Sequence, residues 1–189
     1  MRKPIEYVLT LLCDISLQAS AVSFSTVHKV VENYINEDVG QFLNPQLVIQ
    51  EARLYDIIEI KRMGFSHYAI YIGNGYVQHL SHDYNMFKAA IETRNGQILR
   101  EKLISVAGKD LCRVNNKIRS AKRRGLMQQE PQQIKTYLDA LENATLDYSI
   151  FSYNCEHIVT QWKFGKAFSD QVQFFCNGLC LLYDYPVSF

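Results

Sequence analysis

Apolar residues recur at helical spacing along the first fifty residues of the chain. Between Ile5 and Leu17, and again between Thr26 and Ile35, they repeat every three or four positions, which predicts two amphipathic helices. The pair Asn44–Pro45 then interrupts the pattern, because proline lacks a backbone donor and restricts the residue before it. We therefore predict a small helical extension over residues 1–50, with its apolar faces used for packing.

Beyond residue 54 the pattern changes to short runs of β-branched and aromatic residues. Residues 57–60 form one run, and residues 67–72 and 76–80 form two more on either side of Gly73-Asn74-Gly75. Two such runs around a glycine-rich turn are typical of a β-hairpin. We therefore predict three strands here, of which the last two are antiparallel neighbours.

Further strand and helix signals follow in the second half of the chain. Residues 98–106 favour one or two more strands up to a break near Gly108. Residues 128–144 show helical spacing with Pro131 near the start, and another helix signal follows Asn154. The core of the protein therefore begins near residue 54, after the helical extension.

The composition suits one globular domain with an appendage: 189 residues, of which 48% are hydrophobic and 21% are charged. The net charge of +1 gives no overall field that attracts nucleic acid, so we expect no nucleic-acid partner. One segment is nevertheless basic, with no acidic residue among its charged members Lys117, Arg119, Lys122, Arg123 and Arg124. It is either a solvated face or a contact for anionic phospholipid headgroups.

We expect neither an export signal nor a transmembrane helix. Glu6 and Asp14 interrupt the apolar stretch near the N-terminus, which argues against a signal peptide. The apolar residues 174–183 are too few to span a bilayer, and we assign residues 173–189 to a short apolar tail. The cysteines are odd in number and irregularly spaced, which favours free thiols in a reducing, cytoplasmic compartment.

Cys155 begins the helix that is predicted after Asn154, a favoured N-cap residue. Three apolar residues share its helical face, namely Ile158, Val159 and Trp162. The helix dipole and a nearby imidazolium would lower the thiol pKa from ~8.5 to about 4–7. Cys155 is therefore a candidate nucleophile for acyl transfer, and the alternative is that it serves as a small buried hydrophobic residue.

The candidate partners of the thiol are His67 and His79, one on each strand of the hairpin. A three-residue loop or a compensating bulge would pair Ala69 with His79 and place both imidazoles on one face, whereas a two-residue loop would separate them. On a shared face, His67 would act as general base toward Cys155 and His79 would orient His67. The backbone N–H of Cys155 would stabilise the oxyanion.

Other polar residues near these strands have alternative interpretations. Arg62 is a candidate second oxyanion donor or phosphate contact, or else an ordinary surface arginine. Zinc held by the two histidines and Cys155 is a rival interpretation, but no closely spaced ligand pair supports it, so we expect neither a metal nor another cofactor. His157 lies about 200° around the helix from Cys155 and is expected at the surface or in a local hydrogen bond.

Seven short motifs occur in order between Tyr55 and Val172. They are Asp56-Ile57-Ile58-Glu59-Ile60, His67-Tyr68-Ala69-Ile70-Tyr71-Ile72-Gly73, His79-Leu80, Val106-Ala107-Gly108, Val114-Asn115-Asn116-Lys117, Asn154-Cys155-Glu156-His157 and Ser169-Asp170-Gln171-Val172. Together they resemble the phospholipase A/acyltransferase (H-Ras-like suppressor) family, relatives of lecithin–retinol acyltransferase. The last two motifs are similar to the phospholipase-type branch.

The resemblance implies an α+β domain over residues 51–172 with a circularly permuted papain-like (NlpC-type) fold, in which an antiparallel sheet packs against helices. It implies the triad Cys155, His67 and His79, with Arg62 and Asn154 as substrate-binding residues. Members of the family form an acyl-cysteine thioester from a glycerophospholipid. They transfer the acyl group to water, to a lysophospholipid or to the amine of phosphatidylethanolamine, so we expect a cytoplasmic protein peripheral to membranes.

Some positions depart from the family pattern. Tyr55 replaces a glycine, Tyr68 replaces a tryptophan, and Phe65 replaces a tyrosine and so lacks its hydroxyl. The hydrophobic C-terminal anchor of several members is missing or truncated. Two further functions stay open: an interaction module without chemistry, as in some viral proteins with a similar His-box and Asn-Cys pair, and a cysteine peptidase or amidase.

Overall fold

The computed structural model of the chain describes residues 39–81, 94–149 and 153–174. The elements within these ranges are α3 (Pro45–Glu51), β1 (Ile57–Arg62), β2 (Phe65–Gly73), β3 (Tyr76–Ser81), β4 (Arg94–Lys102), α5 (Leu103–Ala107), β5 (Cys112–Val114), α6 (Ile118–Arg123), α7 (Pro131–Leu141), β6 (Thr145–Tyr148) and α8 (Cys155–Phe164). The helices predicted at Ile5–Leu17 and Thr26–Ile35, and nearly all of the predicted tail, lie outside the described residues. None of the helices within the ranges is long and apolar enough to cross a membrane.

The strands form one six-stranded sheet in the order β5-β1-β2-β3-β4-β6, and every neighbouring pair is antiparallel. The α+β prediction is thus confirmed, as are the strands at residues 57–60, 67–72 and 76–80. Residues 98–106 were expected to form one or two strands, but β4 ends at Lys102 and helix α5 follows. Leu103 and Ala107, four positions apart, are both buried in this short helix, so one helical face covers the sheet.

The β2–β3 hairpin contains the bulge that the two histidines require. Gly73 pairs with Tyr76 and Tyr71 pairs with Val77, so one strand carries an extra residue at this point. The turn residues Asn74 and Gly75 have φ values of 53° and 77°, which a tight hairpin turn needs and which asparagine and glycine tolerate best. The register therefore places Ala69 opposite His79, as the sequence predicted.

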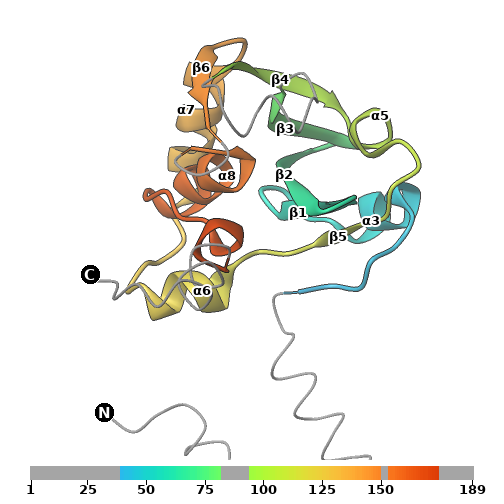
Figure 1. Cartoon of the computed structure of the whole chain (residues 1–189), viewed down its shortest axis with the longest axis horizontal. Helices are drawn as coiled ribbons and strands as arrows, with labels where there is room; N and C mark the ends of the chain where they lie inside the picture. Colours follow the sequence, from blue (N-terminus) through green and yellow to red (C-terminus); the bar gives the residue numbers. More distant parts are fainter. Residues whose placement is uncertain (1–38, 82–93, 150–152, 175–189) are drawn as a thin grey trace, which may run out of the picture. The chain divides into compact units, whose positions relative to one another are not determined.

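Helices cover both faces of the sheet (Figure 1). On one face, α7 and α8 enclose a hydrophobic cluster whose largest buried side chains include Trp162, Ile70, Leu80, Ile98 and Ile134. On the other face, α3 and α5 pack over a second cluster that includes Val48, Ile58, Ile60, Val77 and Leu103. The sheet is therefore buried from both sides, which fixes the strands that carry the two histidines.

The pair Asn44–Pro45 begins a helix, whereas the sequence predicted only an interruption. The Asn44 side chain accepts a hydrogen bond from the Gln46 N–H, and Pro45 occupies the first turn of α3, where its missing donor has no cost. Just before it, Leu43 exchanges backbone hydrogen bonds of 2.8 and 2.9 Å with Cys112 at the sheet edge. Residues 39–51 thus contact β5 and the second cluster directly.

Candidate active site

Helix α8 begins at Cys155 after the N-cap Asn154, as the sequence predicted, and a reciprocal cap with His157 holds it there. The Asn154 side-chain oxygen accepts hydrogen bonds from the Glu156 N–H (2.9 Å) and the His157 N–H (3.2 Å). In return, the Asn154 N–H donates to His157 Nδ1 over 3.3 Å. At the other end, Gly165 closes the helix in the left-handed conformation with a φ of 73°. His157 is therefore a local hydrogen-bonding residue, and Cys155 has a fixed position.

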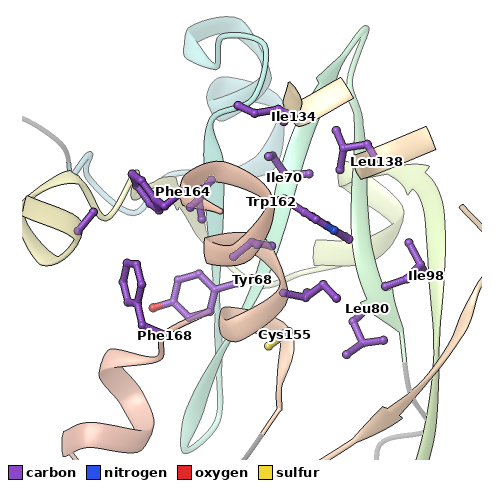
Figure 2. Close-up of a cluster of buried hydrophobic side chains, with 14 residues drawn as sticks. Tyr68, Ile70, Leu80, Ile98, Ile134, Leu138, Cys155, Trp162, Phe164 and Phe168 are labelled. Carbon is purple, nitrogen blue, oxygen red and sulfur yellow. The ribbon is translucent and has the colours of Figure 1, made fainter. Parts of the chain in front are cut away.

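The Cys155 sulfur lies at the edge of the first cluster, against strand β2 (Figure 2). Only 3% of the residue is exposed. The thiol contacts the carbonyl oxygen of Ser66 at 3.9 Å, and the backbone N–H of Tyr68 also donates to the sulfur. Ser66 and Tyr68 are the two neighbours of His67 in the chain, so the nucleophile candidate lies beside that part of β2.

The electrostatics of the thiol differ from the sequence expectation of a depressed pKa. Burial, with a smaller contribution from the negative charge of Glu156, raises the pKa of Cys155 to about 12. Backbone N–H groups of Tyr68, Glu156 and Cys155 point at the sulfur and lower the pKa, but they do not offset desolvation. Cys155 is therefore a neutral thiol in this structure, and it needs a base when it reacts.

The two imidazoles meet, as a shared face requires. His67 Nε2 and His79 Nδ1 are 3.0 Å apart, and the rings cross at 88° with centroids separated by 5.1 Å. Both residues are buried, with 3% and 4% exposure. The two strands therefore bring together residues that are twelve positions apart in sequence in a direct hydrogen bond.

A carboxylate continues this pair and was missed by the sequence analysis. His79 Nε2 lies 2.9 Å from Glu101 Oε2, on strand β4. Burial lowers the pKa of His79, while the hydrogen bond and charge of Glu101 raise it and the charge of Arg62 lowers it. The signal in the sequence was a single acidic residue, Glu101, between positions 94 and 109, but its pairing with His79 depended on a β3–β4 register that no turn motif specified.

Comparison with known proteins identifies the family of the chain. A family model described as lecithin retinol acyltransferase matches residues 50–168. The chain belongs to this family. A human protein named phospholipase A and acyltransferase 4 is 33% identical over 133 residues, which cover 66% of this chain and 77% of the relative. Human phospholipase A and acyltransferase 2 is 38% identical over 126 residues, covering 64% and 75%. Bovine lecithin retinol acyltransferase is 26% identical over 144 residues, covering 67% and 61%. The resemblance inferred from the motifs is thus confirmed.

Arg62 lies at the end of β1 and is bound to the turn after α5. Its guanidinium donates to the carbonyl oxygens of Ala107 (3.0 Å) and Val106 and forms an ion pair with Asp110. These contacts use both terminal nitrogens of Arg62. A role in binding substrate therefore stays a prediction for Arg62, as it does for Asn154, whose side chain caps α8.

A buried ion pair involves Glu156, the residue that follows the nucleophile candidate in the chain. Glu156 is fully buried and pairs with Lys117, which is 7% exposed. Glu156 also accepts hydrogen bonds from the Ser169 hydroxyl and the Gln171 N–H, and Lys117 also donates to the Tyr68 hydroxyl at 3.1 Å. The predicted lipid contact through Lys117 is therefore wrong, because its ammonium group faces the interior.

Gln171 connects this region to the strand of His67. Its side chain accepts from the Ser66 N–H at 2.8 Å and donates to the Ser66 carbonyl at 3.2 Å. Ser66 in turn forms part of the wall of a surface cavity of about 600 Å³. Its other walls include Phe42, Lys61, Arg62, Phe65, Asp170 and Phe174. The residue that the thiol contacts therefore also lines a surface cavity.

The described part of the chain contains free thiols but no set of side chains arranged to bind a metal ion. Cys112 and Cys155, the two cysteines in the described part of the chain, are both free and buried. Among residues 39–81, 94–149 and 153–174, no cluster of three or more histidine, cysteine, aspartate or glutamate side chains is arranged to hold a metal ion.

Proposed function

We propose that the protein is a thiol-dependent phospholipid acyl hydrolase or acyltransferase that works through an acyl thioester on Cys155. Membership of the family and the names of the two human relatives support this reaction class. The observations that carry the proposal are the hydrogen-bonded pair His67–His79 and the contact of the Cys155 thiol with Ser66, the residue before His67. The sheet with α8 packed on it is consistent with the permuted papain-like fold that the family resemblance implies, and we include this fold in the proposal.

The hydrogen-bond chain sets the tautomers of the two histidines. Because Glu101 only accepts when ionised, His79 carries its proton on Nε2 and presents a bare Nδ1. That atom accepts from the Nε2–H of His67 at 3.0 Å. The lone pair of neutral His67 is then on Nδ1. This atom is the base for the thiol, and Glu101 stabilises the positive charge that develops on the histidine pair when the proton arrives.

The proposed reaction proceeds in two steps. The Cys155 proton moves to His67 as the sulfur attacks the ester carbonyl carbon of a glycerophospholipid, and the C–O bond of the tetrahedral intermediate then breaks. His67 gives its proton to the departing alcohol, which leaves as a lysophospholipid. In the second step, water, a lysophospholipid hydroxyl or the amine of phosphatidylethanolamine attacks the thioester carbonyl carbon and loses a proton to His67. The C–S bond then breaks, the acyl group leaves on the acceptor, and His67 returns the proton to the sulfur.

Backbone amides provide the electrostatic support that a buried thiolate needs. The N–H groups of Tyr68, Glu156 and Cys155 face the sulfur. They are positioned before the reaction begins, so they stabilise negative charge there without reorganisation. The high pKa of the resting thiol means that proton transfer to His67 accompanies attack on the ester, rather than preceding it as a stable ion pair.

The burial of Cys155 favours a second candidate function, an interaction module that keeps the fold without chemistry. A thiol that is 3% exposed and has a pKa raised to about 12 is inert until a ligand or a local opening exposes it. Such a module would use the domain surface for binding and would be indifferent to the loss of the sulfur.

Intact-protein mass spectrometry separates the two candidates. After incubation with vesicles of phosphatidylcholine and phosphatidylethanolamine, we expect one acyl adduct on the protein, which hydroxylamine removes because it is a thioester. Cys155→Ala should abolish the adduct, and Cys112→Ala should retain it, because Cys112 is also buried but lies on β5 outside the histidine pair. If the protein yields no adduct, no fatty acid and no N-acylated lipid, the catalytic proposal fails.

A further inference from the structure

Large apolar side chains are exposed around the turn between β1 and β2. Met63, in this turn, is 91% exposed, and Phe174, on the segment after α8, is 76% exposed. Phe174 lines the cavity whose wall includes Ser66, together with Gly64 and the half-buried Phe65. Met63 precedes Gly64 in the chain and therefore lies next to that wall. Exposed apolar groups of this size that border one cavity are characteristic of an interaction surface.

Positive charge adjoins this apolar surface. Lys61 is exposed, and its ammonium group lies 5.6 Å from the centre of the Phe42 ring in the cavity wall. Asp170, also in the wall, bonds the Ser120 hydroxyl at 2.7 Å and Arg124 at 3.1 Å, which holds α6 beside the cavity. Arg123, an exposed cation of that helix, donates to the same Ser120 hydroxyl at 2.9 Å and therefore lies next to this surface.

The two acidic residues of the cavity wall do not oppose an anionic partner. Glu59 is bound by Arg113 at 2.8 Å and by Asn115 at 2.7 Å. Asp170 is bound by Arg124 and Ser120. Both carboxylates are thus neutralised within the protein, and the cations named above supply the charge that an approaching surface meets.

We propose that this face, formed by the β1–β2 turn with Lys61, Phe174 and the exposed Arg123 of α6, docks onto a phospholipid bilayer that contains anionic headgroups. The inference rests on the proposed function in one respect, the phospholipid substrate. Met63 and Phe174 enter the apolar boundary of the bilayer, and Lys61 and Arg123 contact headgroup phosphates. Docking would bring the membrane to the wall residue Ser66, whose carbonyl lies 3.9 Å from the Cys155 sulfur.

Vesicle flotation with the full-length Cys155→Ala protein tests the docking face without chemistry. We expect binding to phosphatidylcholine vesicles that strengthens at least tenfold when one fifth of the lipid is phosphatidylserine and weakens as salt rises. The double variant Met63→Ser/Phe174→Ser should lower the partition coefficient at least tenfold on both lipids. Lys61→Gln/Arg123→Gln should remove most of the phosphatidylserine preference and leave binding to phosphatidylcholine unchanged.

Matched controls lie at the opposite end of the hairpin. Leu54 is 57% exposed and packs 3.8 Å from the position of a Gly73 Cβ, and the exposed Lys102 is opposite Tyr76. Leu54→Ser and Lys102→Gln should bind vesicles as the parent does. Circular dichroism and melting curves confirm that each variant is folded, as expected for exposed positions.

Three results would overturn the docking face. They are no flotation of the parent on either vesicle, equal losses in the Leu54→Ser control and the Met63→Ser/Phe174→Ser variant, and a concentration-dependent dimer that those two substitutions dissociate, since a second copy would then cover the face. An inactive protein that still floats contradicts the proposed function alone. An active protein whose flotation is unchanged by substitutions in the docking face contradicts only this inference.

Discussion

Glu101 determines how much positive charge the histidine pair can hold. In Glu101→Gln the amide oxygen can still accept from His79 Nε2–H, but the charge is gone. The side chain is 43% exposed, so solvent screens part of its effect, and we expect kcat/KM to fall about tenfold, which corresponds to about 1.4 kcal/mol. Because Glu101 raises the pKa of His79, its loss should move the acidic limb of the kcat/KM–pH profile to lower pH.

The pH of the acidic limb distinguishes an electrostatic role of Glu101 from a purely structural one. Glu142→Gln is the matched control, since Glu142 is a similarly exposed carboxylate (38%) that pairs with Arg100 away from the histidines. It should leave both the rate and the limb unchanged. A Glu101→Gln profile that is lower at every pH but unshifted would assign Glu101 a purely structural role.

The thiol of Cys155 should react slowly with alkylating reagents at neutral pH. Its pKa is raised to about 12 by burial, so the thiolate fraction is far below that of a free cysteine, whose pKa is ~8.5. Peptide mapping after iodoacetamide treatment at pH 8 should show modification of Cys155 at least about tenfold slower than in the urea-unfolded chain. The rate should keep rising up to pH 10. A plateau already reached at pH 6 would instead demonstrate a stable thiolate–imidazolium pair.

At the scale of elements, the N-terminus of α8 depends on one side chain. Asn154→Ala removes the acceptor for two backbone N–H groups, so the free energy of unfolding should fall by about 1 kcal/mol in urea titrations. Asn154→Ser restores a capping oxygen and should recover most of that stability. If Asn154 also contacts substrate, as the sequence suggested, the serine variant should be stable but show a higher KM. Unchanged stability in the alanine variant would contradict the capping role.

Local signals sufficed for some elements and not for others. The hairpin and α8 were predictable, because turn glycines, an N-cap asparagine and a terminal glycine each act within a few residues. The sequence indicated that an odd loop or a bulge is needed to place His67 and His79 on one face, but it did not indicate where the bulge lies. Register between β3 and β4 depends on packing of whole strands, so the contact of His79 with Glu101 was out of reach.

Burial of charged groups was the other feature that sequence patterns did not reveal. Glu156 and Lys163 occupy positions of α8 that an amphipathic pattern assigns to the polar face, yet their exposures are 0% and 2%. They are buried because segments far away in the chain supply Lys117 and the carbonyl of Tyr55 as partners. Periodicity reports which residues avoid water, and it carries no information about distant partners for charges.

At the scale of the whole molecule, Lys163 joins α8 to two distant segments. Its ammonium group donates to the Tyr55 carbonyl and to Asn116 Oδ1, each at 2.7 Å. Burial lowers its pKa from 10.5 to about 8, although the charge of Asp56 raises it. Between these two pH values the unfolded chain binds a proton that the folded chain has released. Stability therefore gains a contribution that grows as pH rises from about 8 to 10.5 and is absent below that window.

The difference in unfolding free energy between the parent and Lys163→Met isolates this contribution. Cys112 and Cys155 have raised pKa values and so lower the stability over the same alkaline range, but they do so in both proteins and cancel. Urea titrations at pH 7, 8, 9 and 10 should show the parent gaining on the variant above pH 8, by at most about 1.4 kcal/mol per pH unit. The difference should be flat between pH 7 and 8. A flat difference throughout would mean that the buried ammonium keeps an ordinary affinity for its proton, held by its two carbonyl partners and Asp56 against the cost of burial.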